Sequence, residues 1–96
     1  MKTKTWKTPQ LKKLANVLLS INTEAEILAF LRDIATVEEL DALASRWHVA
    51  QMIHKGIPYR TIAEKTGLST ATITRVAQWI NHGEGGYKTA LDKAKK

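Results

Sequence analysis

The sequence predicts an all-α protein, and three observations support this prediction. Apolar residues recur at intervals of three and four, no alternating run typical of a strand is sustained, and each apolar segment follows a residue that favours a helix N-terminus. Proline occurs only at Pro9 and Pro58, so long helices are permitted elsewhere. A chain of 96 residues corresponds to a single domain over residues 1–96. Its small core would gain stability from a second subunit.

The first helix is predicted to begin at Thr8-Pro9. Threonine is a good N-cap residue, and proline is favoured at the first helical position because its missing N–H has no acceptor there. The apolar residues that follow at helical spacing are Leu11, Leu14, Val17, Leu18 and Ile21. The polar pair Asn22-Thr23 is expected to end this helix.

Two further helices are predicted to begin with capping boxes, in which Thr23 is followed by Glu26 and Thr36 by Glu39. The third helix should be the longest, from about residue 37 to residue 55, and Gly56 should end it. The second helix carries Ile27, Leu28, Phe30, Leu31 and Ile34. The predicted apolar stripe of the third consists of Val37, Leu40, Leu43, Ala44, Trp47, Ala50 and Ile53.

Two short helices, at about residues 59–66 and 70–81, are predicted to form a helix-turn-helix. Small Ala63 would allow the two helices to cross closely. Gly67 would tolerate the positive φ at the turn, and Ser69 would cap the second helix. The core shared by the two helices would be Ile62, Leu68, Ile73 and Val76. A loop at residues 82–86 and a weak helix at about 87–95 would follow.

The outward-facing residues of this segment suit DNA. Hydroxyl groups can bond base edges or phosphates, a threonine methyl or an alanine can contact the thymine methyl, and basic side chains can bind the backbone. The candidate DNA-binding residues are Arg60, Thr61, Lys65, Ser69, Thr70, Ala71, Thr72, Thr74 and Arg75. The alternative is a pair of packed helices with a glycine turn and no role in DNA binding.

The charge distribution favours a polyanionic partner for the C-terminal half. The formal net charge is +6, and the part from Arg46 onward carries nine basic residues against Glu64, Glu84 and Asp92. Ordinary solubilising surface charge is the alternative explanation. There is no cysteine, no apolar run of about 20 residues and no signal-peptide pattern, so we expect a cytoplasmic protein.

The composition gives little support for catalysis or metal binding. His48, His54 and His82 are not spaced three or four residues apart, and no thiolate supplements them. No nucleophile can be paired with a base, and no phosphate-binding glycine loop follows a strand. We therefore expect neither an enzyme nor a bound metal or cofactor.

Three segments carry a resemblance to a known family: residues 36–46, 57–68 and 71–75, the last reading Ala-Thr-Ile-Thr-Arg. They resemble the Trp repressor superfamily, and most closely its YerC/YecD family. The resemblance implies a Trp-repressor-like intertwined homodimer, with dimerisation helices at 9–56, the helix-turn-helix at 57–81, and a loop and C-terminal helix at 82–96. It also implies a transcriptional regulator, a repressor, that reads a roughly palindromic operator. Thr70, Ala71 and Thr74 match the operator-facing positions.

The resemblance also implies an effector pocket. Arg46 and Arg75 match the two arginines that sandwich the corepressor tryptophan in Trp repressor, and Thr36 matches a residue at the pocket mouth. Val76 and Trp79 stand where the family has a glycine and a serine. Both are much larger, and Trp79 could itself occupy the slot against an arginine. These substitutions argue against free L-tryptophan as the corepressor. Alternatively, both arginines form ion pairs with Glu38, Glu39 or Glu64.

A second function class stays open at this point. The chain could be a helical protein-interaction or ligand-sensing module whose helix-turn-helix no longer binds DNA. Salt dependence distinguishes the two, because a protein that contacts several phosphates loses DNA affinity steeply as salt rises.

Overall fold

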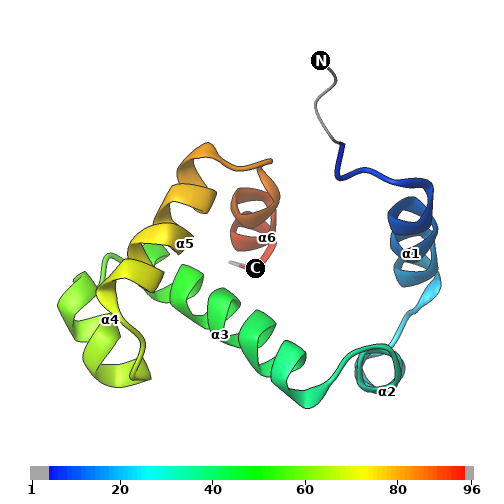
Figure 1. Cartoon of the computed structure of the whole chain (residues 1–96), viewed down its shortest axis with the longest axis horizontal. Helices are drawn as coiled ribbons and strands as arrows, with labels where there is room; N and C mark the ends of the chain where they lie inside the picture. Colours follow the sequence, from blue (N-terminus) through cyan, green and yellow to red (C-terminus); the bar gives the residue numbers. More distant parts are fainter. Residues whose placement is uncertain (1–4, 95–96) are drawn as a thin grey trace. The chain divides into compact units, whose positions relative to one another are not determined.

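The computed structural model describes residues 5–94, and this part of the chain consists of α-helices and loops without a strand (Figure 1). The helices are α1 (Pro9–Ser20), α2 (Glu24–Ile34), α3 (Val37–His54), α4 (Tyr59–Thr66), α5 (Thr70–His82) and α6 (Gly86–Ala94). The all-α prediction is therefore confirmed. None of the described helices is long and apolar enough to span a lipid bilayer.

The predicted helix N-termini are correct because their signals are local. The Thr8 hydroxyl accepts a hydrogen bond from the Leu11 N–H at 3.1 Å, and the Thr23 hydroxyl accepts one from the Glu26 N–H at 3.1 Å. At α3 the capping box is complete. Thr36 Oγ1 accepts from the Glu39 N–H at 3.0 Å, and Glu39 Oε1 accepts from the Thr36 N–H at 2.8 Å. These bonds satisfy N–H groups that have no acceptor within the helix.

The connection between α5 and α6 is shorter than the loop predicted at residues 82–86. Helix α5 continues to His82, where the Gly83 N–H still donates to the Trp79 carbonyl at 2.9 Å. Helix α6 begins at Gly86, and the Thr89 N–H donates to the Gly85 carbonyl at 3.0 Å. The glycine-rich sequence suggested a longer loop, but these backbone hydrogen bonds extend both helices and shorten the connection to residues 83–85.

The chain groups into two compact units, which meet between Leu40 and Asp41. The N-terminal unit contains α1, α2 and the first turn of α3. Neither α1 nor α2 contains a buried residue, although both have an apolar face. The large apolar side chains of these helices that stay exposed are Leu11, Val17, Leu18, Leu19, Ile27, Leu28 and Ile34. Within the described part of the N-terminal unit, α1 and α2 therefore do not bury each other's apolar faces.

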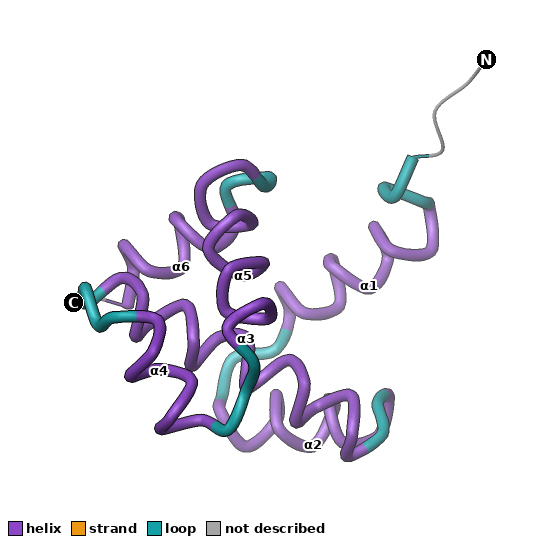
Figure 2. The backbone as a smooth tube through the Cα atoms, turned by 60° about the vertical axis from the view of Figure 1, so that its left-hand side comes forward, coloured by secondary structure: helices purple, strands orange, loops and turns teal. Residues whose placement is uncertain are grey.

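The C-terminal unit has a core built from three helices. Val49, Ala50 and Met52 of α3 pack with one buried residue of α4 and two of α5, which are Ile62, Ile73 and Val76. Helix α5 packs closely on α4 and also on α6, whose Leu91 is buried (Figure 2). The C-terminal unit therefore supplies a rigid base for the segment that contains the candidate site.

The core-facing side of α3 differs from the predicted stripe. Val49 and Met52 were not part of that stripe, yet both are buried, while Val37 and Leu43 are 48% and 53% exposed. Helix α3 is apolar on more than one side, so its spacing alone does not identify the side that the helix-turn-helix covers. Ala50 belongs to both sets and is fully buried.

Candidate nucleic-acid interface

A three-residue turn joins α4 to α5, and its geometry is that of a helix-turn-helix (Figure 2). Gly67 adopts the left-handed conformation, with φ of 76°, and its N–H donates to the Ala63 carbonyl at 2.9 Å. Ser69 then caps α5, because its hydroxyl accepts from the Thr72 N–H at 3.1 Å. The predicted roles of Gly67 and Ser69 are both confirmed.

Thr66 also braces the turn, and the sequence analysis missed it. Its hydroxyl donates to the Ile62 carbonyl at 2.7 Å and accepts from the Leu68 N–H at 3.2 Å. Threonine in the last turn of a helix can back-bond to the carbonyl four residues earlier. The position of a threonine directly before the turn glycine could have predicted this bracing role.

The two helices share the core that their sequence predicted. Ile62 and Ile73 are fully buried, Val76 is 1% exposed, and Leu68 and Ala63 pack against them. Since α3 supplies the rest of this core, the helix-turn-helix is a fixed part of the C-terminal unit.

Most of the candidate DNA-binding residues are exposed, as DNA contact requires. The exposed members are Arg60, Lys65, Ser69, Thr70, Ala71, Thr74 and Arg75. Thr61 and Thr72 are half-buried. The Thr72 hydroxyl lies 3.0 Å from the Ser69 hydroxyl, so these two groups hydrogen-bond to each other at the start of α5.

Gln78 is a further candidate that the sequence analysis missed. It is exposed and lies one turn after Thr74 on the same side of α5. A glutamine amide can donate and accept hydrogen bonds at the same time, which is the pattern that the major-groove edge of adenine requires. The spacing of three and four residues from Ala71 through Thr74 to Gln78 was the available signal.

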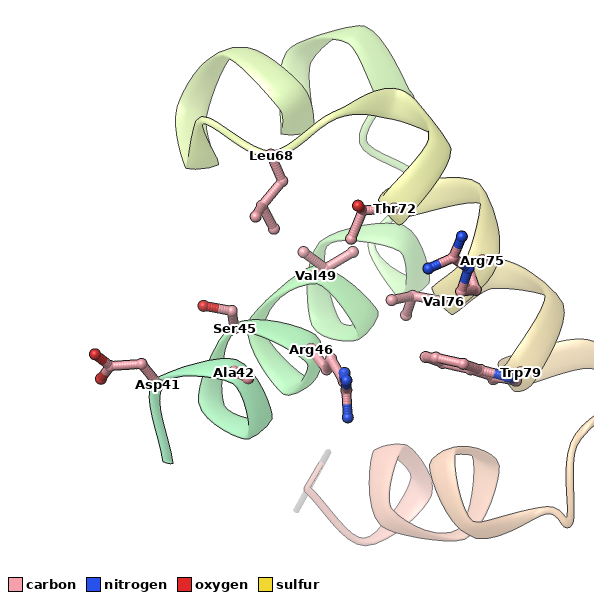
Figure 3. A pocket seen from close by; sticks show the side chains of 10 residues that line it. All are labelled: Asp41, Ala42, Ser45, Arg46, Val49, Leu68, Thr72, Arg75, Val76 and Trp79. Atoms are coloured by element: carbon pink, nitrogen blue, oxygen red, sulfur yellow. The ribbon is translucent and has the colours of Figure 1, made fainter. Parts of the chain in front are cut away.

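A cavity of about 450 Å³ lies between α3 and the helix-turn-helix (Figure 3). Four of the five residues predicted for the effector pocket line it: Arg46, Arg75, Val76 and Trp79. Its other lining residues are Asp41, Ala42, Ser45, Val49, Leu68 and Thr72. Thr36 belongs to the N-terminal unit, where it caps α3.

Trp79 and Arg46 form one wall of this cavity together. The Arg46 guanidinium carbon lies 5.6 Å from the centroid of the Trp79 ring, which is cation–π geometry. Arg46 also influences α6, because burial raises the pKa of the Tyr87 phenol and the positive charge of Arg46 partly offsets that rise. Arg46 thus stacks on a residue of α5 and acts electrostatically on a residue of α6.

The histidines and carboxylates do not assemble into a metal site anywhere in residues 5–94. No group of three such side chains is close enough to hold an ion. The cavity therefore offers guanidinium groups, an indole ring and apolar side chains, together with the Asp41 carboxylate. Such a set suits contacts with planar or apolar groups better than with a metal.

Replacing Gly67 with alanine tests the turn. An alanine at φ of 76° meets no neighbouring atom, so the expected loss comes from the left-handed backbone alone, at about 1–2 kcal/mol. Gly86→Ala is the matched control, because position 86 opens a helix, has open space and lacks a positive φ. Urea unfolding followed by circular dichroism measures both. Equal stability of the two variants would show that the turn does not depend on glycine.

The described geometry defines a class of protein: a helical helix-turn-helix protein whose second helix is capped by serine and exposes threonine, alanine and arginine. The chain matches the family model described as Trp repressor protein over residues 9–95, and it belongs to this family. The family is one of DNA-binding regulators, and the resemblance stated from the sequence is confirmed.

Individual relatives agree with this assignment. The chain is 40% identical to the YerC protein of Bacillus subtilis (strain 168) over 87 residues, which cover 91% of this chain and 84% of YerC. A TrpR-like protein from Eubacterium eligens ATCC 27750 superposes with a TM-score of 0.86 at 37% identity, covering 93% of this chain and 92% of that one. A structure from Staphylococcus aureus superposes with a TM-score of 0.85 at 35% identity, covering 93% of this chain and 89% of that one.

Proposed function

We propose that this chain is a sequence-specific DNA-binding transcriptional repressor that acts in the cytoplasm as a homodimer. The observation that carries the proposal is the exposed face of α5. Thr70, Ala71, Thr74 and Arg75 are all exposed, while Ile73 and Val76 of the same helix are buried. Helix α5 is therefore rigidly held and presents a short row of groups suited to the major groove.

The chemistry of this face supports both phosphate binding and base reading. The first turn of a helix has N–H groups without intrahelical acceptors and a partial positive charge, which favour a phosphate near Thr70. Arg60 and Lys65 of α4 add exposed positive charge to the helix-turn-helix. Thr74 lies one turn into α5, where a hydroxyl and a methyl group can reach base edges.

The homodimer is supported by the uncovered apolar faces of α1 and α2. Monomeric proteins rarely leave extended apolar patches in water, and these two helices contain no buried residue at all. A two-fold dimer would bring the same face of a second copy against them. Two helix-turn-helix segments would then read half-sites about 34 Å apart, one helical turn of DNA.

The repressor role rests on the family to which the chain belongs. A dimer bound over a promoter blocks access of the transcription machinery, which is the simplest outcome of tight operator binding. The cavity beside α5 is the place where a small-molecule effector would modulate this binding, through Arg46, Arg75, Val76 and Trp79.

Selection from a random duplex DNA pool tests the proposal directly. The purified protein should enrich a two-fold symmetric motif without an added ligand. Fluorescence anisotropy on that motif at 50 and 200 mM salt should then show a steep loss of affinity, of about 10³–10⁵-fold if each dimer contacts 6–10 phosphates. Failure to enrich any motif, with little affinity at either salt concentration, would favour a protein-interaction module instead.

Thr74→Ala should reduce discrimination between the selected motif and random DNA by about 1–3 kcal/mol, because a base-reading contact is lost. Competition anisotropy with both duplexes measures this difference. Thr89→Ala, at an exposed threonine of α6, is the matched control and should leave discrimination unchanged. An equal loss of affinity for both duplexes would assign Thr74 to a phosphate contact.

A further inference from the structure

The Arg46–Trp79 stack lies at the open end of the contact between α3 and α5 (Figure 3). Val49 and Val76 belong to the buried core of that contact. Arg46 precedes Val49 by one turn of α3, and Trp79 follows Val76 by one turn of α5. The stack therefore extends the contact between the two helices by one turn beyond the buried core.

We infer that the Arg46–Trp79 stack positions α5 on α3, so that specific DNA binding requires no added small molecule. This inference rests on the proposed DNA-binding function. It states that two residues of the chain itself, Arg46 and Trp79, hold α5 in the orientation that DNA binding requires. Neither residue needs to touch DNA in this role. Both act through the orientation of the exposed face of α5.

The packing around α5 explains why such an element matters. The backbone of α5 packs closely against α4 and α6, whereas its link to α3 depends on side chains. Beyond Val49 and Val76 the side chains diverge and leave the 450 Å³ cavity. The stack bridges from α3 to α5 at this cavity, so its loss would allow the exposed face of α5 to tilt.

Trp79 is suited to this role because its side chain lines two neighbouring cavities. It lines the cavity with Arg46 and Arg75, and it also lines a second, largely apolar cavity with Trp47 and Tyr87. The ring is 41% exposed, so the core alone does not fix it. The guanidinium of Arg46 then supplies the contact that selects one ring position. Because the ring is part of α5, this contact does not depend on capture of a free aromatic molecule.

A double-mutant cycle on Trp79→Ala and Arg46→Ala tests the inference. Each single variant should lower affinity for the selected motif about 3- to 30-fold, the range that a cation–π contact supports, and the double variant should be no weaker than the weaker single variant. Affinity for random DNA should change much less. Lys12→Ala, which removes an exposed positive charge from α1, is the control for net charge.

Two rescue experiments separate positioning from general stability. Trp79→Phe keeps an aromatic ring and should retain most of the specific affinity, at an unchanged melting temperature. Free indole at millimolar concentration should restore part of the specific affinity of Trp79→Ala and leave the wild type unaffected. Losses that multiply in the double variant, or full specificity of Trp79→Ala, would overturn the inference.

Measurements of DNA binding by the wild-type protein, with and without an added aromatic amino acid, test this inference separately from the proposed function. Specific binding that appears only after an aromatic amino acid is added would overturn the inference and leave the DNA-binding proposal intact. Absence of specific binding under all conditions would refute the DNA-binding proposal. In that case the melting temperatures of the two single variants and the double variant decide whether the stack couples α3 to α5. Additive effects of the two substitutions on the melting temperature would reject the coupling.

Discussion

Replacing Ile34 with lysine is expected to dissociate the proposed homodimer. Ile34 is 54% exposed in a single chain and lies on the apolar face of α2 with Ile27 and Leu31. A dimer would bury this side chain in both copies, so the substitution would remove about 3–6 kcal/mol of apolar burial in total. The dimer dissociation constant should therefore rise by about 10²–10⁴-fold. Sedimentation velocity over a concentration series measures it.

The design of this variant separates dimerisation from helix stability. A lysine in the last turn of a helix interacts favourably with the helix dipole, so α2 itself should not be weakened. Ala29→Lys adds the same charge on the other side of α2, about 140° around the helix, and should leave the dimer intact. Affinity of the Ile34→Lys protein for the full two-fold motif should fall to that for a half-site. A variant that stays dimeric at nanomolar concentration would place the interface elsewhere.

Helix boundaries and the turn were predictable from the sequence because their signals lie within a few residues. Thr8, Thr23, Thr36 and Ser69 each accept a hydrogen bond from an N–H three residues further on. Gly67 similarly marks a conformation that other residues rarely adopt. Such features depend on the local sequence, and the structure contains every one of them.

Features that depend on tertiary packing were harder to predict. The apolar spacing of α3 supports more than one buried face, so only the packed helix-turn-helix shows that Val49 and Met52 belong to the core. The Thr72 hydroxyl suits DNA by residue type, yet Ser69 is its neighbour in the structure. Arg46 and Trp79 are distant in sequence, and it was the family resemblance, rather than their spacing, that suggested their association.

The exposed apolar faces of α1 and α2 show a different limit. Their amphipathic pattern is clear in the sequence, and neither helix has a buried residue in the described structure. A pattern of this kind predicts that a helix face will be buried, but it does not identify the partner. The family assignment and the lack of a buried residue in either helix together favour a second copy.

Ile73→Ala is expected to cause a large loss of stability in the C-terminal unit. Ile73 is fully buried and contributes to the core shared by α3, α4 and α5. Truncating a buried isoleucine to alanine typically costs about 2–5 kcal/mol, which includes the cavity left behind. In a small protein this is a large share of a total stability of about 5–15 kcal/mol. Thermal unfolding followed by circular dichroism should show a melting temperature lower by about 10–30 °C.

Thr74→Ala is the matched comparison, because Thr74 is the next residue of the same helix and is exposed. Its stability should change by no more than about 0.5 kcal/mol, and alanine's better helix propensity favours a small gain. Near its lowered melting temperature, Ile73→Ala should therefore weaken binding to selected and random DNA alike, through loss of folded protein, while Thr74→Ala should weaken only the preference between them. The contrast is expected because one side of α5 holds the helix in the core and the other is the proposed DNA-binding face. If both variants lost stability equally, Thr74 would belong to the packed interior and α5 would need a different recognition face.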